Sequence, residues 1–119
     1  MEAVGKFLSL STHVLDTAAG RPAPGVAVRL ESLGADGSWA PAGAGETDSD
    51  GRLRDWLPPG LPGAGRHRLV FATGAYFAGV GVPAFFPEVV VDFEVTAPGE
   101  HHHVPLLLSP FAYSTYRGS

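Results

Sequence analysis

The sequence predicts an all-β protein, a two-sheet β-sandwich that also contains one short helix. Three observations support this fold class. Apolar and polar residues alternate with a period of two along most segments, as they do in half-buried strands. Turn segments rich in Gly, Pro, Asp and Ser separate these strands at a spacing of about 8 to 12 residues, which is typical of sandwiches. The single helix candidate is short and is ended by Pro83.

The first half of the chain is predicted to form three strands joined by turns. The first strand covers residues 6–16, and its two faces carry, respectively, Leu8, Leu10, Thr12 and Val14, and Ser9, Ser11 and His13. The segments that follow are interpreted in order as a turn (17–25), a second strand (26–32), a hairpin loop (34–38), a weak edge strand interrupted by glycine (39–47) and a tight turn built on Asp50-Gly51 (48–52).

The second half of the chain is predicted to contain four more strands and the helix. The strands are expected at residues 66–73, 88–95, 103–109 and 112–118, and the helix at about 74–81. There is neither an internal repeat nor a low-complexity linker in the sequence. We therefore expect residues 1–119 to form a single domain.

Composition excludes several classes of function. The 119 residues include no cysteine, so disulfides, thiolate metal sites and cysteine catalysis are impossible. A net charge of -4 makes nucleic acid and anionic membrane surfaces poor partners. The longest mostly apolar stretch, residues 75–87, falls short of the roughly 20 residues that cross a bilayer, and the first fifteen residues do not resemble a signal peptide. We expect a soluble, cytoplasmic protein.

Histidine is the most informative residue type here, because it can act as an acid, a base or a metal ligand near neutral pH. On a strand, His101 and His103 point to one side of the sheet and His102 to the other. His67 lies between two arginines and is expected to be exposed. His13 faces away from the apolar side of its strand.

Metal binding is considered at two places. The segment "DSDG" is similar to the start of a calcium loop, but no acidic residue follows at the required offset, so a calcium site is rejected. Three imidazoles around an open position can form a catalytic zinc site, and the spacing of His13, His101 and His103 leaves this alternative open. The chain has no G-x-S-x-G, phosphate-loop or H-E-x-x-H motif.

Four segments carry a resemblance to a known family. They are "LSTHVLDTAAGRPAPGVAVRLE", "TDSDGRL", "FFPEVVVDFEV" and "HHHVPLLLSPFAYSTYRGS", and together they extend over essentially the whole chain. The sequence resembles the 5-hydroxyisourate hydrolases, which are transthyretin-related enzymes of purine catabolism. The terminal "YRGS" is the most specific signal, because hormone-carrying transthyretins lack this ending and lack histidine at the position of His103.

The resemblance implies a transthyretin-like sandwich that assembles as a homotetramer around a channel containing the active sites. It places catalytic side chains at His13, Arg52 and His103, and substrate-binding residues at the terminal Tyr116, Arg117, Gly118 and Ser119. One departure from the family pattern is His102, where an aromatic residue such as tyrosine is expected.

The implied reaction is the hydrolysis of 5-hydroxyisourate to 2-oxo-4-hydroxy-4-carboxy-5-ureidoimidazoline, without metal or other cofactor. A histidine would activate water and Arg52 would clamp the substrate. The residues leave open whether His13 or His103 is the base. Two alternatives remain: a zinc hydrolase, and a non-catalytic transthyretin-like carrier of a planar aromatic ligand.

Overall fold

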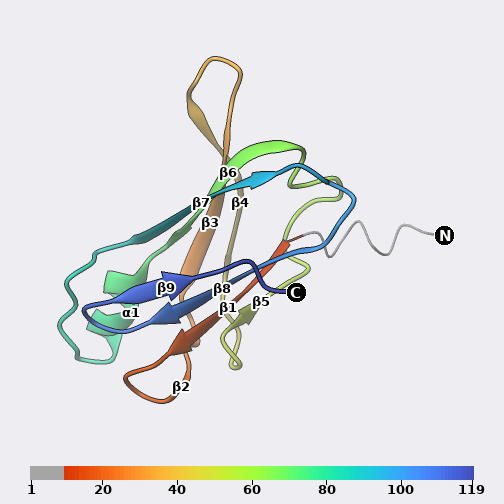
Figure 1. Ribbon diagram of the computed structural model, residues 1–119. Helices are drawn as coiled ribbons and strands as arrows, with labels where there is room; N and C mark the ends of the chain where they lie inside the picture. The colour runs from red at the N-terminus through yellow and green to blue at the C-terminus, as the bar shows by residue number, and fades with distance from the viewer. Residues whose placement is uncertain (1–9) are drawn as a thin grey trace.

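The computed structural model describes residues 10–119 as two β-sheets packed face to face (Figure 1). The first sheet contains β1 (Leu10–Asp16), β2 (Arg21–Pro22), β5 (Arg52–Leu53), β8 (His102–Leu108) and β9 (Tyr113–Thr115). The second contains β3 (Ala27–Leu33), β4 (Trp39–Glu46), β6 (Gly65–Phe71) and β7 (Val89–Val95). The predicted two-sheet sandwich is confirmed; residues 6–9 of the first predicted strand lie outside the described part of the chain.

In the first sheet, β1 is the strand on which the others are organised. The order is β2-β1-β8-β9, and β5 also pairs with β1. β1 runs parallel to β8, with Leu10 opposite His102 and Asp16 opposite Leu108, whereas the other pairs of this sheet are antiparallel. A parallel pair needs a long connection between its strands, and here that connection is the entire second sheet.

The second sheet has the order β4-β3-β6-β7 and is antiparallel throughout. β4 is the glycine-interrupted edge strand that the sequence predicts. Apolar residues of both sheets meet in one core, which includes the fully or almost fully buried Leu10, Val14, Leu30, Leu69, Phe71, Val89, Leu106 and Leu108. Burial of each such side chain contributes roughly 1.5 to 3 kcal/mol to the free energy of folding. The inward side chains of β1 and β8 therefore hold both strands against the core, and their outward side chains are not needed for this packing.

The described residues contain one helix, α1 (Thr73–Gly79), which follows β6 directly. Thr73 and Phe77 are its buried residues, and Phe77 belongs to the core. The expected short helix is thus confirmed. No helix within residues 10–119 combines the length and apolar character required to cross a membrane.

The carboxyl-terminal strand is shorter than the predicted 112–118. β9 pairs with β8 only from Tyr113 to Thr115. The chain then leaves the ladder and returns to β8 at a single bridge between His103 and Gly118. The last residues are therefore held at two separate points of the same strand.

The expectation that His67 is exposed is wrong: only 4% of this residue is accessible. Its Nδ1 lies 2.7 Å from Ser32 Oγ, and its Nε2 donates to the carbonyl of Gly63 at 2.7 Å. The flanking Arg66 and Arg68 point outward and pair with acidic residues of neighbouring strands. Because side chains alternate across a strand, two outward arginines place the residue between them inside.

Candidate functional site

Polar side chains from three neighbouring strands gather on the outer face of the first sheet. In the pairing of β1 with β8, Ser11 lies opposite His103, and in the pairing of β1 with β5, His13 lies opposite Arg52. Residues two apart on a strand, and residues directly opposite one another on neighbouring strands, share a face of the sheet. The register therefore brings these four side chains to the same side, away from the core.

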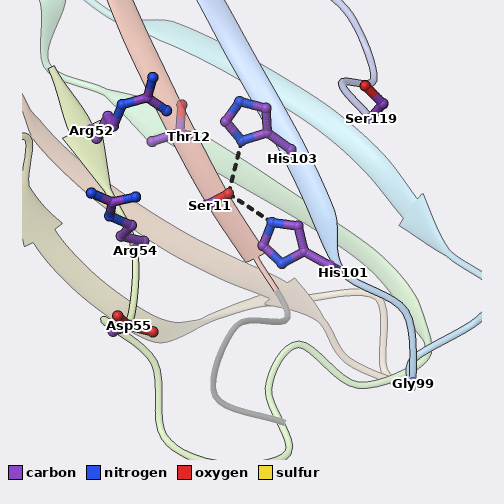
Figure 2. Close-up of a pocket in the computed structure, with 9 residues that line it drawn as sticks. All are labelled: Ser11, Thr12, Arg52, Arg54, Asp55, Gly99, His101, His103 and Ser119. Atoms are coloured by element: carbon purple, nitrogen blue, oxygen red, sulfur yellow. Dashed lines mark hydrogen bonds between the residues drawn. The ribbon is translucent and has the colours of Figure 1, made fainter. Parts of the chain in front are cut away.

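A cleft of about 840 Å³ lies over this face. Its walls are formed by Ser11, Thr12, Arg52, Arg54, Asp55, Gly99, His101, His103 and Ser119 (Figure 2). Figure 2 shows the two arginines on one side of β1 and the two histidines on the other. A molecule in the cleft would thus meet guanidinium groups on one side and imidazoles on the other.

The hydroxyl of Ser11 connects the two histidines. Its Oγ lies 2.8 Å from Nδ1 of His103 and 3.0 Å from Nε2 of His101, as the dashed lines in Figure 2 show. The two rings are nearly parallel, with 17° between their planes and 6.4 Å between their centroids. The Ser11 hydroxyl contacts one nitrogen of each ring, and these contacts leave Nε2 of His103 without a hydrogen bond to Ser11.

His103 is half-buried, and this partial burial is the main cause that lowers the pKa of its ring below the ordinary value. The positive charges of Arg52 and of protonated His101 and His13 lower the pKa of His103 further. The imidazole of His103 is consequently neutral at pH 7, the state in which its free nitrogen can accept a proton.

The turn before β5 positions Arg52. The carboxylate of Asp48 accepts hydrogen bonds from the backbone N–H of Asp50 at 2.8 Å and of Arg52 at 2.9 Å. Gly51 has φ +74°, and its carbonyl accepts a hydrogen bond from the N–H of Val14 at 2.8 Å. A Cβ at Gly51 would lie 2.4 Å from the Val14 carbonyl oxygen, so the turn needs glycine and ties Arg52 to β1.

His13 lies beside the cleft and is not among the residues that form its walls. Its Nε2 lies 2.9 Å from the carbonyl oxygen of Asp50. A carbonyl oxygen only accepts hydrogen bonds, so Nε2 of His13 carries the hydrogen and, in the neutral ring, Nδ1 holds the free lone pair. This hydrogen bond fixes the His13 ring to the same turn that positions Arg52.

The carboxyl terminus ends in the cleft. The N–H of Gly118 donates to the carbonyl of His103 at 2.8 Å, and Ser119 forms part of the cleft wall. A Cβ at position 118 would lie 2.6 Å from Cδ2 of His103. Gly118 therefore allows the backbone to approach the His103 ring closely, and this contact directs the terminal residue toward the cleft.

Tyr116 and Arg117 do not face this cleft. Together with residues of β7 and β8, among them the buried His102, they line a neighbouring groove of about 320 Å³, which borders the cleft at His103. The guanidinium of Arg117 lies 3.1 Å from the carboxylate of Glu100. Of the four terminal residues predicted as a binding group, only Ser119 lines the cleft, and Gly118 supports it through its contact with His103.

Five residues of the cleft were not singled out as site residues from the sequence, namely Ser11, Thr12, Arg54, Asp55 and Gly99. Alternation does place Ser11 on the same face as His13, and Arg54 on the same face as Arg52. The pairing of β1 with β8 was missing from the sequence argument, however, and only this pairing brings Ser11 next to His103.

The zinc alternative was tested on the positions of its ligands. Within residues 10–119, no three or more His, Cys, Asp or Glu side chains are grouped so that they could hold a metal ion. His101 and His103 approach each other through Ser11 instead.

Comparisons with known proteins agree on one family. Residues 10–118 match the model of the HIUase/Transthyretin family. The chain is 47% identical over 110 residues to the 5-hydroxyisourate hydrolase of Salmonella typhimurium, an alignment that covers 92% of this chain and 80% of the relative.

Solved structures show the same transthyretin-like fold. The 5-hydroxyisourate hydrolase of Klebsiella pneumoniae superposes with a TM-score of 0.81 at 37% identity, covering 92% of this chain and 97% of the other. Sea bream transthyretin, solved in complex with thyroxine, gives a TM-score of 0.87 at 33% identity, covering 92% and 94%. An enzyme and a hormone-binding protein thus share this backbone, so the fold by itself does not separate the two activities.

The charge of Arg52 is expected to influence the titration of His103. In an Arg52→Gln variant, the pKa of His103 should rise because a nearby positive charge is lost, yet stay below its ordinary value because the ring is still partly buried. An NMR titration of the imidazole measures this shift. Arg66→Gln, on the second sheet, is the matched control and should leave His103 unchanged. If the pKa of His103 were the same in both variants, the proximity of Arg52 to His103 would be contradicted.

Proposed function

Because the chain belongs to the HIUase/transthyretin family, we propose that it is an enzyme that hydrolyses 5-hydroxyisourate in urate degradation. The observation that carries this proposal is the cleft in which a neutral His103 faces Arg52 next to the carboxyl-terminal Ser119. A carrier of a planar aromatic molecule needs apolar walls and gains little from an imidazole held ready to accept a proton. The side chains of the cleft therefore favour the hydrolase over a carrier.

His103 is the proposed general base. Hydrolysis requires water to attack a carbonyl carbon of the substrate, and a neutral imidazole that removes a proton from this water accelerates the step by about 10² to 10⁴. The pKa of His103 is lowered by burial and by neighbouring cations, which keeps the ring neutral at pH 7. Its Nδ1 lies against Ser11, so Nε2 is the atom that would receive the proton.

Arg52 and His13 would act on the substrate rather than on the water. The planar guanidinium of Arg52 can donate two parallel hydrogen bonds to the polar edge of the substrate and stabilise the negative charge that develops on the carbonyl oxygen. His13 stands opposite Arg52, and its Nδ1 lone pair can accept a hydrogen bond from the substrate, so we assign it the role of orienting partner. The substrate is an electron-poor, activated ring, so this scheme uses neither a metal nor another cofactor.

The terminal residues would complete the site from the other side. Ser119 is proposed to contact the substrate, with Gly118 supporting it through the His103 carbonyl. Tyr116 and Arg117 are assigned a supporting role outside the cleft, because Arg117 is held there by Glu100.

Residues 1–119 are proposed to act as one domain. The proposed location is the cytoplasm, and the absence of cysteine is compatible with that reducing compartment.

A homotetramer is part of the proposal. The cleft lies on an outer face of the sheet, and a second subunit beside it would shield the bound substrate and the attacking water from bulk solvent. Several large hydrophobic residues are exposed, including Phe85 (71%), Phe111 (69%) and Tyr116 (57%). Phe85 and the exposed Tyr113 both pack against Phe86 and form a continuous apolar patch, and such patches mark interaction sites. We expect analytical ultracentrifugation at micromolar concentration to give the mass of four chains, and a fully active monomer would contradict this assembly.

The proposed activity is tested by the decay of 5-hydroxyisourate absorbance, which the protein should accelerate beyond the spontaneous rate. His103→Thr should lose most of this activity, about 100-fold or more, because threonine suits a strand but supplies no base near pH 7. Circular dichroism checks that the variant is folded. A folded His103→Thr protein with near wild-type turnover would show that His103 is an ordinary surface histidine.

The zinc alternative is tested on the wild-type sample by measuring its metal content and the sensitivity of its activity to a chelator.

Extending the carboxyl terminus is expected to block the site. A short tag after Ser119, or deletion of residues 116–119, should reduce activity far more than the same tag placed before Met1, because an extension would have to pass through the cleft. Turnover and oligomeric state are compared for the two tagged proteins. Equal activity of two intact assemblies would mean that the terminus is not part of the site.

A further inference from the structure

The Ser11 hydroxyl has an unusual position, since it lies within hydrogen-bond distance of two imidazoles at once. The residue is only 7% exposed, and its place opposite His103 is set by the parallel pairing of β1 with β8. His101 precedes His103 by two residues, which places both rings on the same side of the sheet. The arrangement is therefore built into the strand register.

Counting hydrogens shows that the two rings cannot choose their tautomers independently. A serine hydroxyl has one hydrogen to donate and two lone pairs to accept with. When the hydroxyl donates to Nδ1 of His103, it must accept its second hydrogen bond from Nε2–H of His101. When it donates to Nε2 of His101, it must accept from Nδ1–H of His103.

The two arrangements differ at the atom proposed to perform the chemistry. In the first, neutral His103 carries its hydrogen on Nε2, and this nitrogen cannot remove a proton from water. In the second, the hydrogen is on Nδ1, and Nε2 holds the free lone pair. Only the second arrangement makes His103 a base toward the cleft, because its Nδ1–H then donates to the Ser11 hydroxyl.

We propose that Ser11 is a positioning residue that sets the base-competent tautomer of His103 and relays a proton between His103 and His101. This inference rests on the proposed hydrolysis. When water attacks, one of its protons moves to Nε2 of His103, the Nδ1 hydrogen of His103 moves to Ser11 Oγ, and the hydroxyl hydrogen moves to Nε2 of His101. The positive charge is then on His101.

The same transfers in reverse complete the reaction. Nε2–H of His103 protonates the nitrogen of the ring amide as its C–N bond breaks, Nδ1 regains a hydrogen from Ser11, and Ser11 regains one from His101. One proton has then moved from water to the leaving nitrogen, and all three side chains have returned to their starting forms. No oxidant, reductant or further reactant is required.

The surroundings favour charge on His101 over charge on His103. His103 is half-buried, and Arg52 and His13 both disfavour a second positive charge there. His101 is the more exposed of the two rings, so its imidazolium form loses less hydration than that of His103. The remaining charged groups of the cleft are Arg54, Asp55 and the carboxylate of Ser119. Transfer of the proton from a partly buried to an exposed ring reduces the cost of desolvating the charge.

The test compares Ser11→Ala, Ser11→Thr and His101→Gln in the full-length protein. Ser11→Ala and His101→Gln should lower kcat by about tenfold to 100-fold with KM little changed, less than the loss of a complete general base. Ser11→Thr retains the hydroxyl and should stay within about threefold of wild type. Ser32→Ala is the matched control, because it also removes a Ser–His hydrogen bond, the one at 2.7 Å to the buried His67. It should leave kcat unchanged in folded protein.

A second measurement does not depend on activity. Nitrogen NMR of the imidazoles should place the hydrogen of neutral His103 on Nδ1 in the wild type and in Ser11→Thr, and should show a shift toward the Nε2–H form in Ser11→Ala. An unchanged tautomer, or wild-type kcat in folded Ser11→Ala, would overturn the inference. If the wild-type protein does not hydrolyse 5-hydroxyisourate, the proposed function fails, whereas the tautomer measurement still decides whether Ser11 couples the two rings.

Discussion

The parallel pairing of β1 with β8 is the constraint on which the rest of the site depends. Leu10 and Val14 of β1, and Leu106 and Leu108 of β8, fix the two strands against the core with their inward side chains. Because side chains alternate, this packing also determines what faces outward. A shift of one residue in this register would place the site residues toward the core, so the stability of the fold and the geometry of the cleft have the same cause.

The site owes its electrostatic character to the number of basic groups that the register brings together. Two arginines, two histidines on the cleft wall and His13 beside it share one side of the first sheet. Partial burial and these neighbouring positive charges together keep His103 neutral, as its lowered pKa indicates. The positive charges of this cluster also attract the oxygen atoms at the polar edge of the substrate and stabilise negative charge that develops on them. The neutral state of His103 and the stabilisation of an oxyanion by Arg52 are therefore both favoured by one cluster of basic groups.

The sequence predicted those features that follow from local rules. Alternation separated His102 from its two neighbours, and the tight turn on Asp50-Gly51 was predicted where the structure has the turn that leads into β5. Pairing between strands far apart in the chain leaves no local pattern, so the contact between Ser11 and His103 could not be predicted. His67 was misjudged because the charge of its neighbours was given more weight than alternation. Arg117 and Ser119 are separated because the regular strand ends at Thr115 and the chain returns to β8 only at the Gly118 bridge.

The central claim is that the outer face of β1, β5 and β8 is where the substrate reacts. A crystal structure of the protein with a stable analogue of 5-hydroxyisourate tests this claim most directly. The account predicts an analogue in the cleft of Figure 2, with the Arg52 guanidinium on its polar edge, Nε2 of His103 facing the carbon to be attacked, and Ser119 in contact. An analogue bound elsewhere, for example in the groove beside His102 and Tyr116, with the cleft left open to solvent, would contradict it.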